Sequence, residues 1–252
     1  MAVMEFLSQN FINTTSMMTI VGGNSTLFPY LFDKGTRLGW SSSGFNDDNT
    51  STVISITLPS NTVISHILLQ KHNLRQFRAY YNSVTANSLF VTTSNSASST
   101  YISFASVTCN SIDIQMTKTI VANAEKEVGE LYVGYRNVAF ERNPAIENYK
   151  AMIHRKQIIH EMPDGGKVAY NVKDKFQANI AWGWITPTFY DQLRTIYSSA
   201  LPQVFVPFPT VTLWDGLGYE IIITGDFDFN YGDNTKAQGY SGSLMIEQTP
   251  GG

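Results

Sequence analysis

The clearest candidate for chemistry in this sequence is a pair of aspartates alternating with phenylalanines, Asp226-Phe227-Asp228-Phe229. Alternate side chains of a β-strand point to opposite faces, so the two carboxylates would lie roughly 6–7 Å apart on one face. Carboxylates at that spacing could serve glycoside hydrolysis or bind calcium. We favour a simpler interpretation, a solvent-facing acidic pair behind a core-facing aromatic pair, because the other acidic residues are scattered.

A second candidate is a polar loop that follows an aromatic residue. Asp33 and Trp40 lead into the Ser, Asn and Asp-rich stretch from Ser41 to Thr52. An exposed tryptophan beside such side chains can stack on a sugar while the polar groups hydrogen-bond its hydroxyls. The alternative is that Trp40 closes one end of a β-sandwich from the inside.

The other reactive residue types form no pattern known for catalysis or metal binding. His154 and His160 are six positions apart, which matches neither the helical zinc pair nor a zinc-finger spacing, and His66 lies in an apolar run. The single cysteine, Cys109, excludes an intrachain disulfide and is expected to be a small buried residue. No nucleophile elbow, P-loop or dinucleotide fingerprint is present. We expect no enzymatic activity, no catalytic residues, no metal and no cofactor.

Composition narrows the class of partner. Charged residues make up 15% of the chain and the net charge is −3, which gives no electrostatic footprint for nucleic acid. No stretch reaches the roughly 20 apolar residues of a membrane span, so we expect no membrane insertion. The start, Met1 to Phe6, lacks the basic and apolar regions of a signal peptide, so we expect synthesis in a cytoplasm. A surface rich in Ser, Thr and Asn suits contact with proteins or carbohydrate.

The candidate residues in the first half of the chain must be positioned by short strands. Val53 to Leu58 alternates apolar and polar residues, Asn61 to Gln70 is densely apolar, and Phe77, Ala79 and Tyr81 alternate again. Polar turns separate these runs, and regularly spaced short strands favour a sandwich or jelly roll. We place a domain boundary between Gly134 and Asn143, so that residues 1–135 form the first domain.

The second half, residues 136–252, predicts a β-sandwich with one packed helix. A hairpin is expected from 156–162 and 167–172, joined by Pro163-Asp164-Gly165-Gly166. A strand over 176–184 should bury Trp182. Thr186 and Pro187 are typical of a helix start, and apolar residues at helical spacing follow, so a helix is predicted near 187–199.

The first half then resembles a known family. The run from Phe32 to Ser42, the strands from Val53 to Leu58 and from Ile64 to Asn73, and the closing run from Val128 to Gly134 are similar to discoidin-like, galactose-binding-like jelly rolls. The resemblance implies a galactose-binding-like jelly-roll domain with an N-terminal extension. In sugar-binding members, loops at one end carry the ligand. The resemblance thus adds two residues to the candidate carbohydrate-binding set, which becomes Asp33, Trp40, His72 and Asn73.

The second half resembles bacteriophage tail and baseplate proteins. The resemblance rests on Arg142-Asn143-Pro144, Trp214, Gly225 to Phe229 and Gly239 to Leu244. It implies a structural, non-enzymatic protein of the virion that assembles with other tail or baseplate proteins, as a homo-oligomeric ring or an adaptor, and that supports host attachment. The alternative is a carbohydrate-binding, lectin-like protein that uses the first-domain loops to bind a glycan. A glycoside hydrolase using Asp226 and Asp228 is the third reading.

Overall fold

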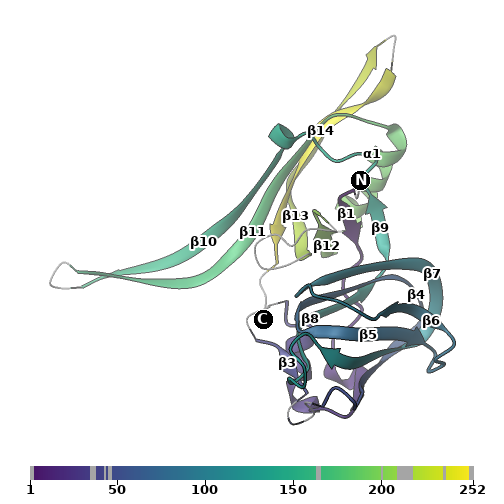
Figure 1. Cartoon of the computed structure of the whole chain (residues 1–252). Coiled ribbons are helices and arrows are strands. Elements are labelled where there is room, and N and C mark those ends of the chain that lie inside the picture. The colour runs from purple at the N-terminus through teal and green to yellow at the C-terminus, as the bar shows by residue number, and fades with distance from the viewer. Residues whose placement is uncertain are drawn as a thin grey trace.

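The protein is described by a computed structural model that covers residues 3–34, 38–42, 44, 47–162, 166–199, 201–208, 218–234 and 237–249. Within these residues the strands form two antiparallel sheets of seven strands each, in two lobes (Figure 1). One α-helix and three short 3-10 helices, Thr15–Met17, Ser25–Leu31 and Ile146–Asn148, complete the described elements. The predicted all-β fold class is confirmed.

The first lobe is a jelly roll whose sheet runs in the order β3-β8-β4-β7-β5-β6, with β2 added to β4. Its strands are β2 (Met18–Val21), β3 (Trp40–Ser41), β4 (Thr52–His72), β5 (Leu74–Tyr81), β6 (Ser88–Thr92), β7 (Thr100–Thr119) and β8 (Glu127–Gly134). The sequence predicted two strands, 53–58 and 61–70, where the structure has the single strand β4. Pro59 lies between the two predicted strands and does not end β4. The β4–β7 ladder shifts register between Thr57 and Thr62, and a proline is tolerated in a sheet at such a bulge.

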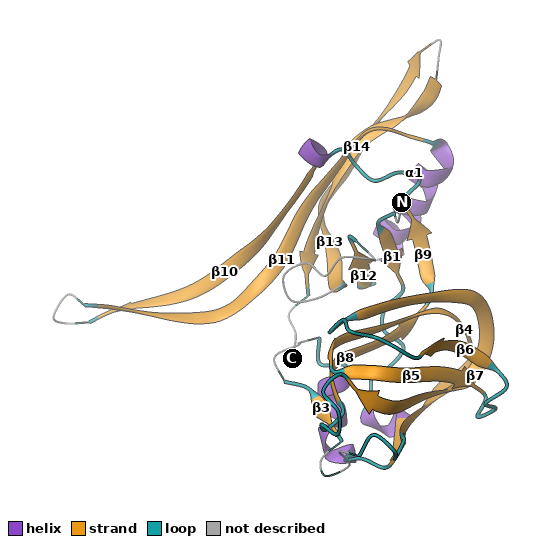
Figure 2. Ribbon diagram, viewed as in Figure 1, coloured by secondary structure: helices purple, strands orange, loops and turns teal. Residues whose placement is uncertain are grey.

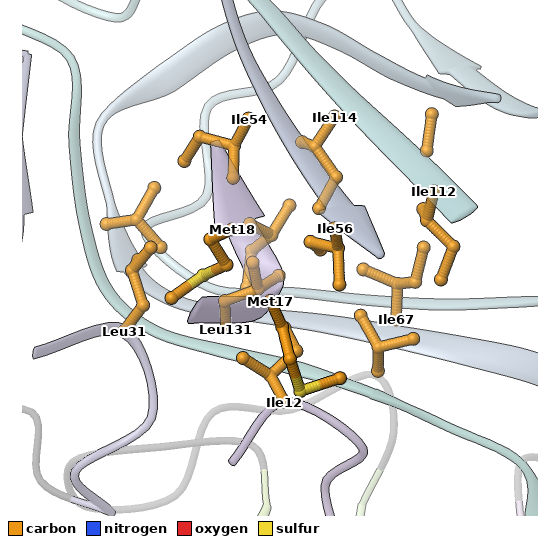
Figure 3. Packing of buried hydrophobic residues seen from close by; sticks show 14 of the residues in the cluster. Ile12, Met17, Met18, Leu31, Ile54, Ile56, Ile67, Ile112, Ile114 and Leu131 are labelled. Atoms are coloured by element: carbon orange, nitrogen blue, oxygen red, sulfur yellow. The ribbon is translucent and has the colours of Figure 1, made fainter. Parts of the chain in front are cut away.

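The jelly-roll core follows from the alternation seen in the sequence. Ile54, Ile56 and Leu58 of β4 are at most 4% exposed, and Ile112 and Ile114 of β7 are their neighbours in the core. Figure 3 shows the four isoleucines of this set converging with side chains of the N-terminal segment, Ile12, Met17 and Met18. Burying each such side chain contributes about 1.5–3 kcal/mol, so this alternation is the main local signal that fixes which face of β4 points inward.

The second lobe is built on one curled sheet in the order β10-β11-β14-β13-β12-β1-β9. Its strands are β1 (Glu5–Leu7), β9 (Arg136–Ala139), β10 (Tyr149–Glu161), β11 (Lys167–Ile185), β12 (Gln203–Val206), β13 (Tyr219–Asn234) and β14 (Ala237–Gln248). The curl brings the two ends of the sheet face to face. Ring centroids of Phe140 and Trp182 lie 5.4 Å apart, and those of Phe176 and Phe205 lie 6.1 Å apart.

The helix α1 (Pro187–Ser199) closes the core of this lobe (Figure 2). Its start is as predicted, since the Thr186 hydroxyl accepts a hydrogen bond from the Phe189 backbone N–H at 3.1 Å. Phe189, Leu193 and Ile196 form one buried stripe, which confirms the predicted helix and its packed face.

Strand β1 links the two lobes in an order that the sequence did not predict. It pairs antiparallel with β12 on one side and with β9 on the other, so residues 5–7 complete the sheet of the second lobe. The chain then leaves for the jelly roll and returns at Arg136. The proposed division at residue 135 remains a prediction. Strand β1 precedes that residue in the sequence but belongs to the sheet of the second lobe.

The predicted hairpin is present and is much longer than expected. Strand β10 starts at Tyr149, and β11 runs without a break through the segment predicted as a separate strand. The backbone N–H of Met162 donates to the Gly166 carbonyl at 2.7 Å, which closes the ladder, while 163–165 lie outside the described residues. In Figure 1 this hairpin extends well away from both lobes.

Candidate binding and assembly surfaces

Trp40 does not offer a ring to solvent, so the exposed tryptophan of the sugar-loop interpretation is not found. Its side chain is 0% exposed, and its indole Nε1 donates a hydrogen bond to the Asn24 carbonyl at 2.8 Å. Asn24 also caps the 3-10 helix Ser25–Leu31. Trp40 therefore closes the end of the sandwich, which was the alternative interpretation.

The structure brings His72 close to Trp40 but buries both. Each is a register partner of Val128, one from each side of β8. The His72 ring is also held at both nitrogens: Nδ1 accepts from the Leu74 N–H at 3.1 Å, and Nε2 lies 2.8 Å from the Thr100 hydroxyl. Burial lowers the pKa of His72 to about 4. This histidine therefore supports the fold and faces no solvent-filled site.

Asn73 also has a structural part. Its Nδ2 donates to the Glu125 carbonyl at 2.6 Å, and its Oδ1 accepts from the Glu127 N–H at 2.9 Å. These bonds fix the turn between β4 and β5 against the start of β8. The half-buried Asp33 does not line a cleft itself, but its neighbours Phe32 and Lys34 are in the wall of one.

That cleft lies where the two lobes meet. It has a volume of about 270 Å³, and its wall includes Gln9, Asn13, Phe32, Lys34, Pro202 and Glu220. The Lys34 ammonium and the Glu220 carboxylate form an ion pair at 2.7 Å across the junction. Amide groups, an ion pair and an aromatic ring are the groups that hydrogen-bond and stack on a small polar ligand. Sequence reasoning missed this set because residues far apart along the chain contribute it.

A buried polar network lies deeper in the same junction. The Glu5 carboxylate accepts a hydrogen bond from the Tyr101 hydroxyl and lies 3.4 Å from the Arg136 guanidinium and 3.5 Å from His66 Nε2. Burial and then the nearby Arg136 charge lower the pKa of His66 to about 4. Burial, followed by the bond to Glu5, raises the pKa of Tyr101. The network links the two lobes, and no motif in the sequence predicts it.

The long β10–β11 hairpin carries exposed apolar side chains where it leaves the rest of the sheet. Strand β11 pairs with β14 only from Gln177 onward, so among the described strands only β10 and β11 form the sheet between Ile153 and Phe176. Near its end Ile159, Met162 and Val168 are 60%, 48% and 37% exposed. We call the two-stranded part, residues 153–176, the hairpin arm.

The aspartate pair lies on the other hairpin of this sheet, formed by β13 and β14. Asp226 and Asp228 are exposed, while Phe227 and Phe229 pack towards the core. The ring of Tyr190 on α1 lies 5.4 Å from that of Phe227. The predicted arrangement, an acidic solvent face behind an aromatic core face, is confirmed.

Two further surveys cover the described residues alone. No three side chains of His, Cys, Asp or Glu gather there as ligands for a metal ion. None of the helices within that part of the chain is long and apolar enough to cross a membrane.

Comparison with known proteins gives structural neighbours only. No protein family and no curated sequence matches the chain. Chitosan-binding module 1 of a Paenibacillus sp. IK-5 chitosanase/glucanase superposes at 15% identity and TM-score 0.38, over 46% of this chain and 92% of that module. A CBM32 module from Clostridium perfringens, in complex with GalNAc-beta-1,3-galactose, matches at 11% identity and TM-score 0.37, over 48% and 96%. A Ruminococcus gnavus GH29 fucosidase matches at 13% identity and TM-score 0.41, over 51% and 27%.

Proposed function

We propose that this protein is a non-enzymatic structural subunit of an oligomeric assembly, of the ring or adaptor type found in bacteriophage tails and baseplates. In this proposal it is made in the host cytoplasm and ends in the virion. The observation that carries the proposal is the hairpin arm. The resemblance of the second half of the sequence to tail and baseplate proteins adds the type of assembly.

The physical argument is that such an arm needs a partner. Nine residues of β10, from Ile153 to Glu161, extend past the third strand, which at about 3.3 Å per residue is roughly 30 Å. A two-stranded hairpin alone in water is marginally stable. The outer edge of β10 also has no neighbouring strand in the described sheet, and such an edge pairs readily with another chain. An assembly that covers the arm would pair the backbone N–H and C=O groups along its outer edge and would bury its apolar side chains.

The test is to remove the arm and keep the rest of the sheet. Residues 156–173 are replaced by Asn-Gly, a two-residue turn that rejoins Arg155 to Asp174, its partner in the ladder. We expect full-length protein to form closed rings in negative-stain electron microscopy and multi-angle light scattering. The shortened variant should stay near the mass of one chain while keeping a cooperative melting transition. Full-length protein that remains a 28.1 kDa monomer at high concentration would overturn the proposal.

The cleft between the lobes favours a second function, binding of a glycan at the junction of the jelly roll with the second lobe. Its amide, aromatic and charged groups are suited to one hydroxylated sugar unit. The test is binding of a glycan panel that includes chitotriose and GalNAc-beta-1,3-galactose by wild type and by Asn13→Ala with Glu220→Gln. Asn110→Ala, an exposed amide elsewhere on the lobe, is the control. Binding that is lost only in the cleft variant supports this function, and no binding to any glycan removes it.

A further inference from the structure

One carboxylate of the jelly roll is buried on the outer face of its sheet. Ile112 and Ile114 of β7 point into the core, so Asp113 between them points to the opposite face. Asp113 is nevertheless only 3% exposed. One of its oxygens, Oδ1, accepts a hydrogen bond from the Ser55 hydroxyl, whereas Oδ2 has no hydrogen-bond partner within the described residues. A buried carboxylate oxygen without a partner is costly, so Oδ2 is an acceptor that needs a donor.

The neighbours of Asp113 on this face also have hydrogen-bonding groups that the fold does not use. Tyr80 on β5 is its register partner, and the Tyr80 hydroxyl makes no hydrogen bond to the described part of the chain. Arg78, two residues earlier, donates through Nε to Gln115 Oε1 at 2.6 Å, and its two terminal nitrogens make no hydrogen bond to the described residues. The Arg78 guanidinium lies 5.8 Å from the centre of the Tyr80 ring. An acceptor, a phenol and two donor nitrogens therefore share one face.

This face is five strands wide. Strands β2, β4, β7, β5 and β6 pair in that order, and at about 4.8 Å between neighbours they span roughly 19 Å. Apolar side chains stand on the same face at its two ends: Val21 on β2 is 70% exposed, and Val91 on β6 is 59% exposed. Hydrogen-bonding groups in the middle and C–H groups at both ends suit an extended ligand that lies across the strands.

The two charges on this face favour a neutral, hydroxylated ligand. A cation would meet the Arg78 guanidinium and an anion would meet the Asp113 carboxylate, so like charges oppose both. A sugar hydroxyl can donate to Asp113 Oδ2, and its neighbour can accept from the terminal nitrogens of Arg78. We propose that this face of the jelly roll binds a neutral oligosaccharide laid across the strands, with Asp113 and Arg78 as its anchors.

Binding at this face requires one side chain to move. Asp113 Oδ2 is inaccessible in this structure, so the ligand must displace a neighbour of Asp113, and the long Arg78 side chain is the most flexible one beside it. The site shares no residue with the cleft between the lobes, and it does not depend on the assembly proposed above. It is therefore tested separately from both proposed functions.

The test is isothermal titration calorimetry of the full-length chain with cellohexaose, mannohexaose and xylohexaose. Asp113→Asn keeps the size of the side chain and removes its charge, and Arg78→Met removes the donors of Arg78. We expect wild type to bind at least one hexasaccharide, and each variant to bind it roughly tenfold or more weakly, because each loses a charge-assisted hydrogen bond. Arg75→Met, at an exposed arginine on the same strand, is the matched control and should bind as wild type does.

Melting temperatures establish which variants are folded. Where Asp113→Asn is unstable, Arg78→Met decides, and unchanged binding in Arg78→Met overturns the site. Wild type that binds none of the three hexasaccharides also overturns it. Binding that is lost in Asn13→Ala with Glu220→Gln but kept in Asp113→Asn and Arg78→Met places the sugar in the cleft, which overturns this site and leaves the second proposed function standing.

Discussion

The Tyr101 hydroxyl, on β7 of the jelly roll, donates a hydrogen bond to the Glu5 carboxylate, on the first strand of the other lobe. Both side chains lie in the junction, and Glu5 is only 7% exposed. Leu7, Leu68 and Val206 form an apolar cluster there that also draws on both lobes. The junction is therefore a continuous packed contact, and the jelly roll is held in place by it.

Removal of one hydroxyl should weaken that junction measurably. In Tyr101→Phe the buried Glu5 carboxylate loses a donor, and leaving a buried acceptor unpaired costs about 1–3 kcal/mol. Urea unfolding followed by tryptophan fluorescence measures the loss. Tyr231→Phe, at an exposed tyrosine, should change the free energy of unfolding by under about 0.5 kcal/mol. Equal effects of both substitutions would show that the bond contributes nothing.

Stability should fall as the pH drops through the window set by two buried histidines. His66 and His72 have pKa values of about 4 in the folded chain, against an ordinary value of 6.5. Between these values the unfolded chain binds more protons, so each histidine removes up to roughly 3 kcal/mol as the pH falls from about 6.5 to 4. Above pH 6.5 both histidines are mostly neutral in the folded and in the unfolded chain, so they cause no loss of stability there.

The measurement is urea unfolding at several pH values for His66→Gln, His72→Gln and the control His160→Gln. Each buried-site variant should show a shallower loss of stability between pH 6.5 and 4 than wild type. The exposed His160 variant should keep the wild-type slope. Slopes that stay the same in all three variants would exclude the histidines as the cause.

Trp182 should be the side chain of the second lobe whose truncation is most damaging. It is 4% exposed and packs against Phe140, Phe189 and Phe229. Trp182→Ala should cost about 3–5 kcal/mol, and Trp182→Phe a smaller 1–2 kcal/mol by a rough estimate. The indole Nε1 has no hydrogen-bond partner within the described residues, so the phenylalanine variant breaks no such bond. A shift in Tm of one degree or less in the alanine variant would contradict this packing.

Cys109 should react with a thiol reagent only after unfolding. It is 1% exposed, and burial raises its thiol pKa, so little thiolate forms and none is accessible. Wild-type protein with DTNB should show no fast reaction until urea is added. Ser106→Cys, at an exposed position on the same strand, supplies a second thiol that should react at once. Fast labelling of the wild-type chain would show that the jelly roll opens readily at β7, which lies between β4 and β5.

Local pattern predicted the elements well where burial on one face decides the structure. The alternation of Ile54, Ile56 and Leu58 and the cap at Thr186 both gave correct results, because each depends on neighbours in the chain. Strand length was underestimated in both lobes. Polar positions in β4 and β11 look like turns to a local reading, whereas ladder pairing with distant strands keeps them extended.

The sugar-site prediction relied on residue type, which does not reveal whether a side chain is exposed, and it remains a prediction. Trp40 and His72 have the chemistry of binding residues, but burial and existing hydrogen bonds occupy their polar atoms. The cleft that includes Lys34 and Glu220 could not be predicted, because its two sides come from positions that only the folded junction brings together. Composition and pattern likewise gave no sign of how far the hairpin arm extends.

The position of β1 has a consequence for the order in which the chain can fold during synthesis. Residues 5–7 leave the ribosome before the jelly roll, but their partners, 136–139 and 203–206, follow only after the whole jelly roll. The jelly roll can therefore complete its own sheet first, whereas the sheet of the second lobe is complete only after β14, residues 237–248, has been synthesised. A nascent chain stalled before residue 203 would leave β1 with an open edge, exposed to capture by chaperones or by other unfinished chains.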